Sequence, residues 1–302
     1  MKLSAPAYYT QFHCIADRCT HSCCVGWEID IDPDTLQKYA DISHPYGTKI
    51  RESIDRDAET PCFRLGEGER CPHLDGQGLC RIIGALGEGY LCEICREHPR
   101  FYNRTREGLE VGLGMACEEA CRLILTSDRF TEITEIGEVD SIAKEPDFDV
   151  LPVRAQLLAI LADPTRSHAE RLRFLYDVCG VSPTLLPDEG WKERLAALEY
   201  LEDAHRALFA CYRSDTYTPQ PLEAPLSRAL GYLIYRHCTA ARDAVELREA
   251  LLFCFVCERL LASLATNEGV CDVTGLVPLA VTLSEEIEYS EENTAAIKAA
   301  LA

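Results

Sequence analysis

The sequence predicts a mainly α protein in which a Cys-rich, irregular N-terminal metal domain precedes an all-α helical bundle. Eleven of the 17 cysteines lie within the first 121 residues, among glycines and short turns. From about residue 150 onward, apolar residues recur every three to four positions, which is the period of an amphipathic helix. We therefore expect a metal-binding domain over residues 1–126, an acidic linker over 127–149 and a helical domain over 150–302.

Within the N-terminal region, local signals predict three short helices and one tight turn. Asp32 before Pro33 marks a helix start, because Asp caps a helix well and Pro suits its first position. Two further helices are expected near residues 48–56 and 117–126. The intervening stretch should consist of loops, with a small hairpin turn at Asp75-Gly76-Gln77-Gly78.

The acidic stretch at residues 127–149 is predicted to be irregular, and Pro146 disfavours a helix there. The helical pattern that follows predicts an all-α bundle. Cys254 and Cys257 fall within an apolar helical segment and are expected to pack in the core. The expected helices are Val153–Leu161, His168–Val178, Trp191–Tyr212, Leu226–Thr239, Val245–Thr266 and Ser284–Leu301.

Composition restricts the compartment and the partners. The first residues show no apolar segment of the kind found in signal peptides, and no run of about 18 apolar residues suggests a membrane span. We therefore expect a cytoplasmic chain with reduced thiols and no membrane partner. The net charge of −20 disfavours nucleic acid, since phosphate binding needs a basic surface. An acidic surface would instead suit a lysine-bearing protein.

Thiols at this density in a reducing compartment are most simply explained as metal ligands. The first group is Cys14, Cys19, Cys23 and Cys24. Side chains of adjacent residues diverge, so we expect one of the last two to be a ligand and the other to pack. Buried packing of all four is the alternative.

The second group of thiols extends from Cys71 through Cys80 to Cys92 and Cys95. The last two form a Cys-x2-Cys pair, which could be half of a zinc knuckle or a redox pair. Cys117 follows at the start of a predicted helix. We rank as the likeliest ligands Cys19, Cys23, Cys80 and Cys95.

An all-thiolate, widely spaced set favours an iron–sulfur cluster over zinc. Histidines beside the cysteines keep a mixed zinc site open; these are His13, His21, His73 and His98. Arg96 and Arg100 place two guanidinium groups close to the Cys95 thiol, where they could offset a cluster's negative charge or hold a carboxylate. Surface ion pairing is the alternative for both arginines.

In combination these motifs resemble the flagellin lysine-N-methylase family, and the later ones are also similar to Cys-rich proteins thought to chelate zinc or iron. The resemblance covers roughly residues 8–126. Cys62, Cys92 and Cys121 look additional to the family's pattern. The matching segments are Phe12-x-Cys14-x4-Cys19-x3-Cys23-Cys24-x2-Trp27, Cys71-Pro72-x-Leu74-Asp75, Gly78-Leu79-Cys80-x-Ile82 and Leu91-x3-Cys95-Arg96-x2-Pro99-Arg100.

The resemblance implies transfer of a methyl group from S-adenosylmethionine to a lysine ε-amine of flagellin, or of another lysine-bearing protein, with a 4Fe–4S cluster. Arg96 and Arg100 are the expected cofactor-binding residues, and no recognised nucleotide-binding loop marks the donor site. The alternative is a non-enzymatic zinc- or iron-binding module. The cysteines carried over as metal ligands are Cys14, Cys19, Cys23, Cys24, Cys71, Cys80, Cys95 and Cys117.

Overall fold

The N-terminal strand pairs with strands that lie far along the chain. β1 (Lys2–Pro6) runs parallel to β5 (Gly108–Leu113) and antiparallel to β6 (Ile133–Glu138). β4 (Arg100–Arg104) completes a sheet of order β4-β5-β1-β6. This sheet corrects the prediction of an irregular N-terminal region and an irregular linker, since β6 lies within residues 127–149. The pairings of β1 were not predicted because its partners lie more than a hundred residues away. The local hairpin of β4 and β5 was missed although its strands are close in sequence.

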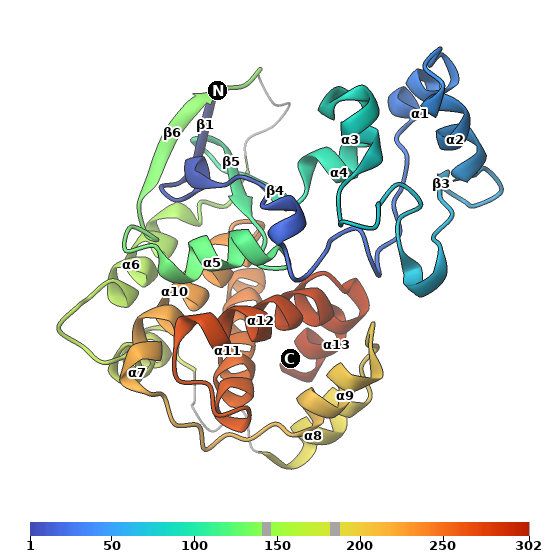
Figure 1. Ribbon diagram of the computed structural model, residues 1–302. Coiled ribbons are helices and arrows are strands. Elements are labelled where there is room, and N and C mark those ends of the chain that lie inside the picture. Colours follow the sequence, from blue (N-terminus) through green and yellow to red (C-terminus); the bar gives the residue numbers. More distant parts are fainter. Residues whose placement is uncertain (141–145, 182–187, 302) are drawn as a thin grey trace. The chain divides into compact units, whose positions relative to one another are not determined.

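The computed structural model describes residues 1–140, 146–181 and 188–301 (Figure 1). By contact, the chain groups into two compact units. Unit 1 comprises Met1–Phe12 and Arg100–Ala302, and unit 2 comprises His13–Pro99. These limits differ from the predicted limits at residues 126 and 149, because β1, β4 and β5 join the helical part through the sheet. Residues 141–145 of the predicted linker lie outside the described part.

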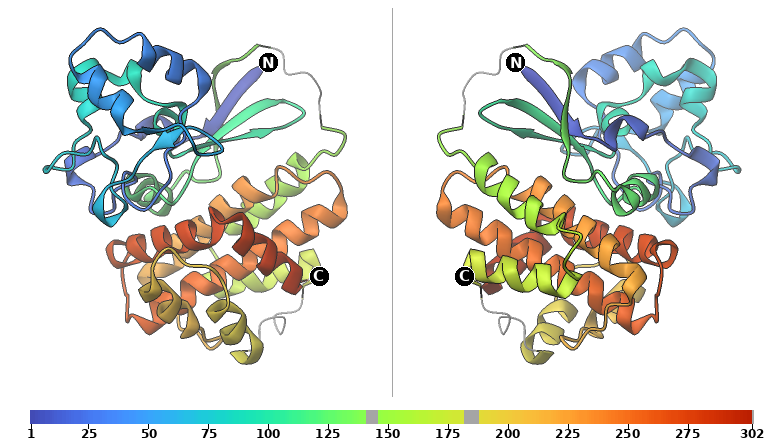
Figure 2. Two further views of the ribbon diagram at one scale, coloured as in Figure 1. Left: turned by 90° about the vertical axis from the view of Figure 1, so that its right-hand side faces the viewer. Right: turned by 90° about the vertical axis from the view of Figure 1, so that its left-hand side faces the viewer.

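Helices dominate unit 1, so the prediction of a mainly α fold with a helical second half is confirmed. Figure 2 shows the four strands together on one side of these helices. Local capping explains several helix starts: the Ser167 and Glu170 side chains form a capping box at α7, and Asp243 caps α11. The helices of unit 1 are α5 (Glu118–Thr126), α6 (Leu151–Leu161), α7 (His168–Cys179), α8 (Asp188–Ala196), α9 (Asp203–Ala210), α10 (Gln220–His237), α11 (Ala244–Asn267), α12 (Val273–Leu283) and α13 (Glu291–Leu301).

Three helix predictions need correction. The expected helix at residues 191–212 is divided into α8 and α9. The expected helix at residues 284–301 consists of a π-helical turn, Ser284–Glu288, followed by α13. α12 was not predicted at all, because Pro278 lies inside it; its signal was Asp272, whose side chain caps the helix by accepting from the Gly275 amide.

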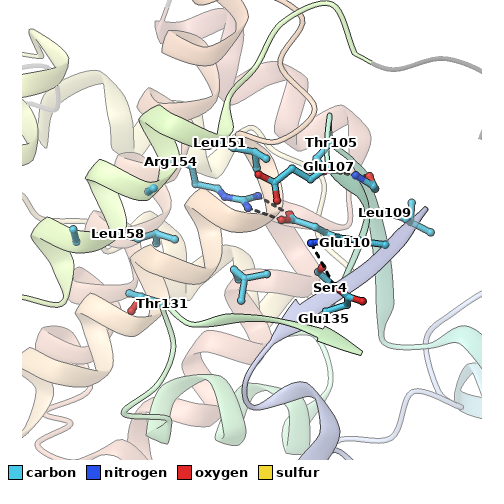
Figure 3. Close-up of a pocket in the computed structure, with 15 residues that line it drawn as sticks. Ser4, Thr105, Glu107, Leu109, Glu110, Thr131, Glu135, Leu151, Arg154 and Leu158 are labelled. Atoms are coloured by element: carbon cyan, nitrogen blue, oxygen red, sulfur yellow. Dashed lines mark hydrogen bonds and ion pairs between the residues drawn. The ribbon is translucent and has the colours of Figure 1, made fainter. Parts of the chain in front are cut away.

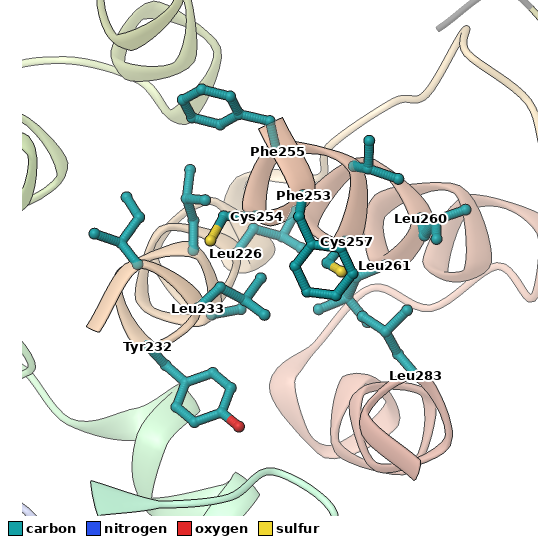
Figure 4. Packing of buried hydrophobic residues seen from close by; sticks show 14 of the residues in the cluster. Leu226, Tyr232, Leu233, Phe253, Cys254, Phe255, Cys257, Leu260, Leu261 and Leu283 are labelled. Atoms are coloured by element: carbon teal, nitrogen blue, oxygen red, sulfur yellow. The ribbon is translucent and has the colours of Figure 1, made fainter. Parts of the chain in front are cut away.

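The core of unit 1 forms around α11, which is 24 residues long and buried on most of its circumference. A helix that is apolar all round is expected to lie inside a domain. In Figure 4, Cys254 and Cys257 point into this apolar cluster with Phe253 and Leu261, so the prediction that they are core residues is confirmed. No helix in the described part of the chain is long and apolar enough to cross a membrane.

Unit 2 has its own, smaller core, to which Tyr39, Ile50 and Phe63 contribute. The predicted cap is confirmed, because the Asp32 side chain accepts a hydrogen bond from the Thr35 amide. The predicted turn at 75–78 is confirmed by an antiparallel bridge between Leu74 and Cys80. The elements of unit 2 are α1 (Pro33–Ala40), α2 (Tyr46–Ser53), β2 (Ile54–Asp55), β3 (Cys62–Phe63), α3 (Arg81–Leu86) and α4 (Glu93–Glu97).

Candidate functional site

Five thiols from three separate segments gather in the core of unit 2. They pack within or against one hydrophobic cluster, and the thiols affect one another electrostatically. Four of them are among the eight cysteines predicted as ligands, and the fifth had been set aside as additional to the family's pattern. The thiols are those of Cys24, Cys71, Cys80, Cys92 and Cys95.

Local backbone structure explains how these segments meet. The Cys71 amide donates to the Cys24 carbonyl at 2.8 Å, which holds the first and second segments side by side. Cys80 ends the Asp75–Gly78 turn and stands at the N-terminus of α3. Cys92 stands at the N-terminus of α4, so Cys95 follows within the first turn of the same helix.

The Cys92 and Cys95 thiols behave as a coupled pair. A hydrogen bond from the Cys95 thiol lowers the pKa of Cys92, and the same hydrogen bond raises the pKa of Cys95. The Tyr39 hydroxyl lies 3.4 Å from the Cys92 sulfur and also donates to the Tyr90 carbonyl at 2.7 Å. Within the pair, Cys92 is therefore the thiol that ionises more readily, as expected for a Cys-x2-Cys pair.

The surroundings shift the pKa values of the other three thiols, Cys24, Cys71 and Cys80, in different directions. A hydrogen bond from Cys23 lowers the pKa of Cys24 to about 7. Burial raises the pKa of Cys71 to about 11, and the charges of Cys24, Cys80 and Cys92 add to this effect. Burial also raises the pKa of Cys80. Of these three thiols, that of Cys24 therefore ionises most readily, and those of Cys71 and Cys80 hold their protons more tightly.

The five thiols are chemically suited to bind a metal ion or an iron–sulfur cluster, because cysteine thiolates are usual ligands of both. As the side chains stand, however, no three His, Cys, Asp or Glu residues of the described chain form a ready ligand set. The arrangement brings candidate ligands into one neighbourhood. A bound cluster would require their side chains to turn toward it.

The remaining predicted ligands are not among these five thiols. Cys14 is exposed, and the Cys19 thiol donates to the His21 carbonyl at 2.8 Å. Cys23 is exposed but contacts the group through Cys24. Cys117 belongs to unit 1, where it is the residue before α5.

His73 has a structural role in unit 2. Its Nδ1 lies 2.9 Å from the Tyr46 hydroxyl, its Nε2 lies 3.0 Å from the Ser53 hydroxyl, and its ring packs edge-on against Phe63. Burial lowers the pKa of His73 to about 4. Both ring nitrogens are engaged, so in this arrangement His73 cannot bind a metal ion.

The two arginines predicted to bind the cofactor lie in different units. Arg96 is half exposed and pairs with the adjacent Glu97 at 3.3 Å, as the surface alternative supposes. Arg100 belongs to unit 1, where its Nε donates to the Tyr9 hydroxyl at 3.0 Å and its guanidinium lies 5.7 Å from the centre of the Phe12 ring. Their assignment to a cofactor stays a prediction.

Unit 1 contains a cavity of about 480 Å³ between the sheet and α6 (Figure 3). This volume is in the range of small-molecule sites. In Figure 3 the Arg154 guanidinium points toward the Glu110 carboxylate, and Glu107 and Glu135 add negative charge to the lining. Among the described residues that line the cavity there is no cysteine. The charges of Arg154 and Glu110 already satisfy each other. The sequence contained no motif for this cavity.

Comparison with known proteins finds relatives that align with most of this chain. The chain is 24% identical over 278 residues to a protein named lysine-N-methylase from Salmonella typhimurium, a match that covers 89% of this chain and 68% of the relative. The corresponding protein of Salmonella choleraesuis matches to the same extent. The resemblance inferred from the sequence motifs is confirmed. The similarity to the lysine-N-methylases extends well beyond the Cys-rich region in which the motifs lie.

A second relative, named flagellar biosynthetic protein FliU, from Salmonella muenchen, is 28% identical over 148 residues. That match covers 47% of this chain and 86% of the relative. No protein-family model matches the chain, and no solved structure matches it. The lysine-N-methylase relatives therefore provide the functional comparison, and the structure provides the placement of the residues.

Proposed function

We propose that the protein is an iron–sulfur-dependent protein-lysine N-methyltransferase that uses S-adenosylmethionine, with flagellin as the expected substrate. The observation that carries this proposal is the similarity to proteins named lysine-N-methylase over 89% of the chain. The relative named as a flagellar biosynthetic protein supports flagellin as the substrate class. The net charge of −20 would also favour association with a lysine-rich surface.

The thiol group of unit 2 supports the proposed cluster. Four of the five thiols in this core would hold it, with Cys92 among them; the five are Cys24, Cys71, Cys80, Cys92 and Cys95. Such a cluster supplies a redox-active centre whose charge is spread over iron and sulfide. The protein's own contribution is a partly buried group of thiols, with the Tyr39 hydroxyl beside Cys92.

The proposed reaction is a displacement at the donor methyl carbon. The lone pair of a neutral lysine ε-amine forms the new N–C bond, and the electron pair of the breaking S–C bond goes to sulfur. S-adenosylhomocysteine leaves, and the methylated ammonium loses one proton to solvent or to a nearby base. The acceptor must therefore arrive without its proton, or lose it in the site.

The test is to purify the protein without oxygen and measure iron, sulfide, zinc and visible absorbance. Methyl incorporation from labelled S-adenosylmethionine into flagellin is then followed for the parent chain, Cys95→Ala and Cys257→Ala. We expect a brown protein that methylates lysine. Cys95→Ala should lose both iron and transfer, whereas Cys257→Ala, a core variant of unit 1, should keep both.

Two outcomes would contradict the proposal. A colourless protein with one zinc per chain and no methyl transfer would indicate a structural metal module. Full iron and full transfer in Cys95→Ala would remove this thiol from the ligand set.

A further inference from the structure

The cavity of unit 1 combines an aliphatic wall with a charged one (Figure 3). Three carboxylates line it, those of Glu107, Glu110 and Glu135, together with the cationic groups of Lys2 and Arg154. Helices and sheets normally pack closely, so an open space of about 480 Å³ between them is available to a ligand. The aliphatic wall is formed by Leu109, Ile133, Leu151, Ala155, Leu158 and Ala159.

Small side chains on α6 leave this space open. Ala155 and Ala159 both line the cavity, one turn of the helix apart, and both are exposed. Leu158 lines the same cavity but is buried. The helix therefore offers an aliphatic surface to a ligand without filling the volume beside the sheet.

Four of the five charged side chains of the cavity form pairs. Arg154 donates two hydrogen bonds to the buried Glu110 carboxylate, at 2.6 and 2.7 Å. Lys2 Nζ lies 3.4 Å from Glu135 Oε2, and both of these side chains are exposed. Glu107 is also exposed, and it has no ion pair within the part of the chain that the structure describes. The lining thus has one negative charge without a counter-charge.

The turn between β4 and β5 fixes the position of Glu107. The Thr105 hydroxyl accepts from the Gly108 amide at 3.2 Å, and the Thr105 amide donates to the Gly108 carbonyl at 2.8 Å. In Figure 3 the Glu107 side chain extends from this turn toward α6. A carboxylate is therefore placed beside the aliphatic surface, at an exposed part of the cavity.

The chain segment that borders the cavity is acidic as well. Residues 127–140 carry five carboxylates and one arginine. Two of these carboxylates are paired, Asp128 with Arg228 and Glu132 with Arg129, and the segment stays acidic after these pairs are formed. β6 lies within this segment and is the outer strand of the sheet, so an extended polypeptide can pass alongside it.

The lining distinguishes between classes of ligand. An anion would meet three carboxylates and only two cations, both of which are paired. A nucleoside would find no aromatic ring among the described residues that line the cavity. An alkylammonium group matches both walls, because its methylene chain suits the aliphatic residues and its ammonium donates to a carboxylate.

We propose that this cavity binds the side chain of the lysine that the protein methylates, with the methylene chain against Ala155 and Leu158 and the ammonium paired with Glu107. That this lysine is the methyl acceptor rests on the proposed function. A free amine has the same chemistry as the end of a lysine side chain. The acidic segment beside the cavity favours a polypeptide that carries further basic residues.

The experiment measures binding by calorimetry with the iron-loaded full chain and three probes. The first is a short peptide of glycine and serine with one central lysine, the second has norleucine in place of the lysine, and the third is butylamine. Norleucine keeps the aliphatic chain and lacks the ammonium. Butylamine has the ammonium and lacks the peptide backbone.

Three variants are each compared with the parent chain. Glu107→Gln removes the unpaired carboxylate, and its control is Glu249→Gln, which removes the same charge from an exposed position on α11. Ala155→Phe fills the cavity, and its control is Gln156→Phe, at an exposed neighbouring position of α6 that does not line the cavity. Lys2→Gln removes the cation that occupies Glu135.

Glu107→Gln should weaken binding of the lysine peptide by roughly two- to five-fold, the usual effect of an exposed ion pair, and Glu249→Gln should not. Lys2→Gln should strengthen it by roughly the same factor, because Glu135 becomes available and a repelling charge is lost. A gain in affinity cannot arise from misfolding. Ala155→Phe should abolish measurable binding, whereas Gln156→Phe should retain it. The norleucine peptide should not respond to the charge variants.

Equal weakening by Glu107→Gln and Glu249→Gln would show general attraction to an acidic surface and overturn the inference. Full binding by Ala155→Phe, or unchanged methyl transfer to flagellin with an unchanged KM, would overturn it too while leaving the proposed function intact. Butylamine that binds as tightly as the lysine peptide would assign the cavity to free amines and overturn its assignment to a protein substrate. If the lysine peptide binds as expected but the parent chain transfers no methyl group, the proposed function fails and the cavity remains a lysine-binding site.

Discussion

Arg154 on α6 donates two hydrogen bonds to the Glu110 carboxylate on β5, at 2.6 and 2.7 Å, and both side chains are buried. The same guanidinium donates to the Thr239 hydroxyl at 2.7 Å and lies 5.0 Å from the centre of the Tyr235 ring. A single side chain thus connects the sheet to two helices of unit 1. This bidentate geometry is one that lysine could not reproduce.

We predict that Arg154→Met lowers the free energy of unfolding by about 3–5 kcal/mol, because Glu110 is then left buried without its partner. The double variant Arg154→Met with Glu110→Leu should recover much of the loss, since no unpaired charge remains. Chemical denaturation of the parent, both single variants and the double variant measures this cycle. Purely additive losses would contradict the pairing.

A second prediction concerns the close contact between Gly112 and Phe101 across β5 and β4. A Cβ at Gly112 would lie 2.3 Å from the end of the Phe101 ring, whereas a Cβ at Gly137 on β6 would meet nothing within 4 Å. Gly112→Ala should therefore destabilise the protein by about 1–3 kcal/mol through overpacking. Gly137→Ala should be close to neutral. Thermal unfolding of the two variants compares them directly, and equal stabilities would contradict the contact.

Some of the structure could be predicted because its signals are local. Asp32, Pro33 and the 75–78 turn act through neighbouring residues, so that the sequence alone indicated α1 and the turn before Cys80. The helical periodicity after residue 150 predicted the helices there for the same reason. The position of β1 in the sheet could not be predicted in this way, because it pairs with β5 and β6 across more than a hundred residues. The β4–β5 hairpin is local and was missed.

In the candidate sites, too, the features with local sequence signals could be predicted and those that depend on the fold could not. Cysteine density predicted that thiols would gather, but the resemblance set Cys92 aside although its Cys-x2-Cys spacing places it beside Cys95. The cavity of unit 1 had no signal in the sequence. Its lining includes residues of β1, β5, β6 and α6, and only the fold brings them together.

The pairing of His205 with Glu286 should make stability depend on pH. His205 Nδ1 lies 2.5 Å from a Glu286 carboxylate oxygen, and this hydrogen bond raises the pKa of His205. Glu202 and Glu285 face the same ring and act in the same direction. The folded state thus holds a proton more tightly than the unfolded state, whose histidine pKa is about 6.5.

The stabilisation is therefore complete below about pH 6.5 and is lost as the pH rises through the raised pKa of the folded state. We predict that His205→Gln removes this part of the pH dependence, since glutamine can donate a hydrogen bond but cannot be charged. Denaturation of the parent and the variant at several pH values from about 5.5 to 9 measures it. Parallel curves for the two proteins would contradict the prediction.

The last prediction tests whether Cys92 belongs to the proposed cluster site. Its thiol is fully buried, contacts Cys95 and lies 3.4 Å from the Tyr39 hydroxyl. Cys62 provides a matched control, because it is a buried thiol of the same unit whose electrostatic neighbours are carboxylates, not thiols. Loss of a ligand thiolate should remove the metal, whereas loss of a packing thiol should lower stability by about 1 kcal/mol.

Cys92→Ala should therefore lose most of its iron and its visible absorbance, and Cys62→Ala should keep both. The comparison does not depend on methyl transfer, so it separates the location of the cluster from the identity of the substrate. Tyr39→Phe should give an intermediate result, because the sulfur keeps its place but loses a hydrogen bond. If Cys92→Ala retains full iron while Cys71→Ala and Cys80→Ala lose it, Cys92 packs beside the cluster and the ligands are Cys24, Cys71, Cys80 and Cys95.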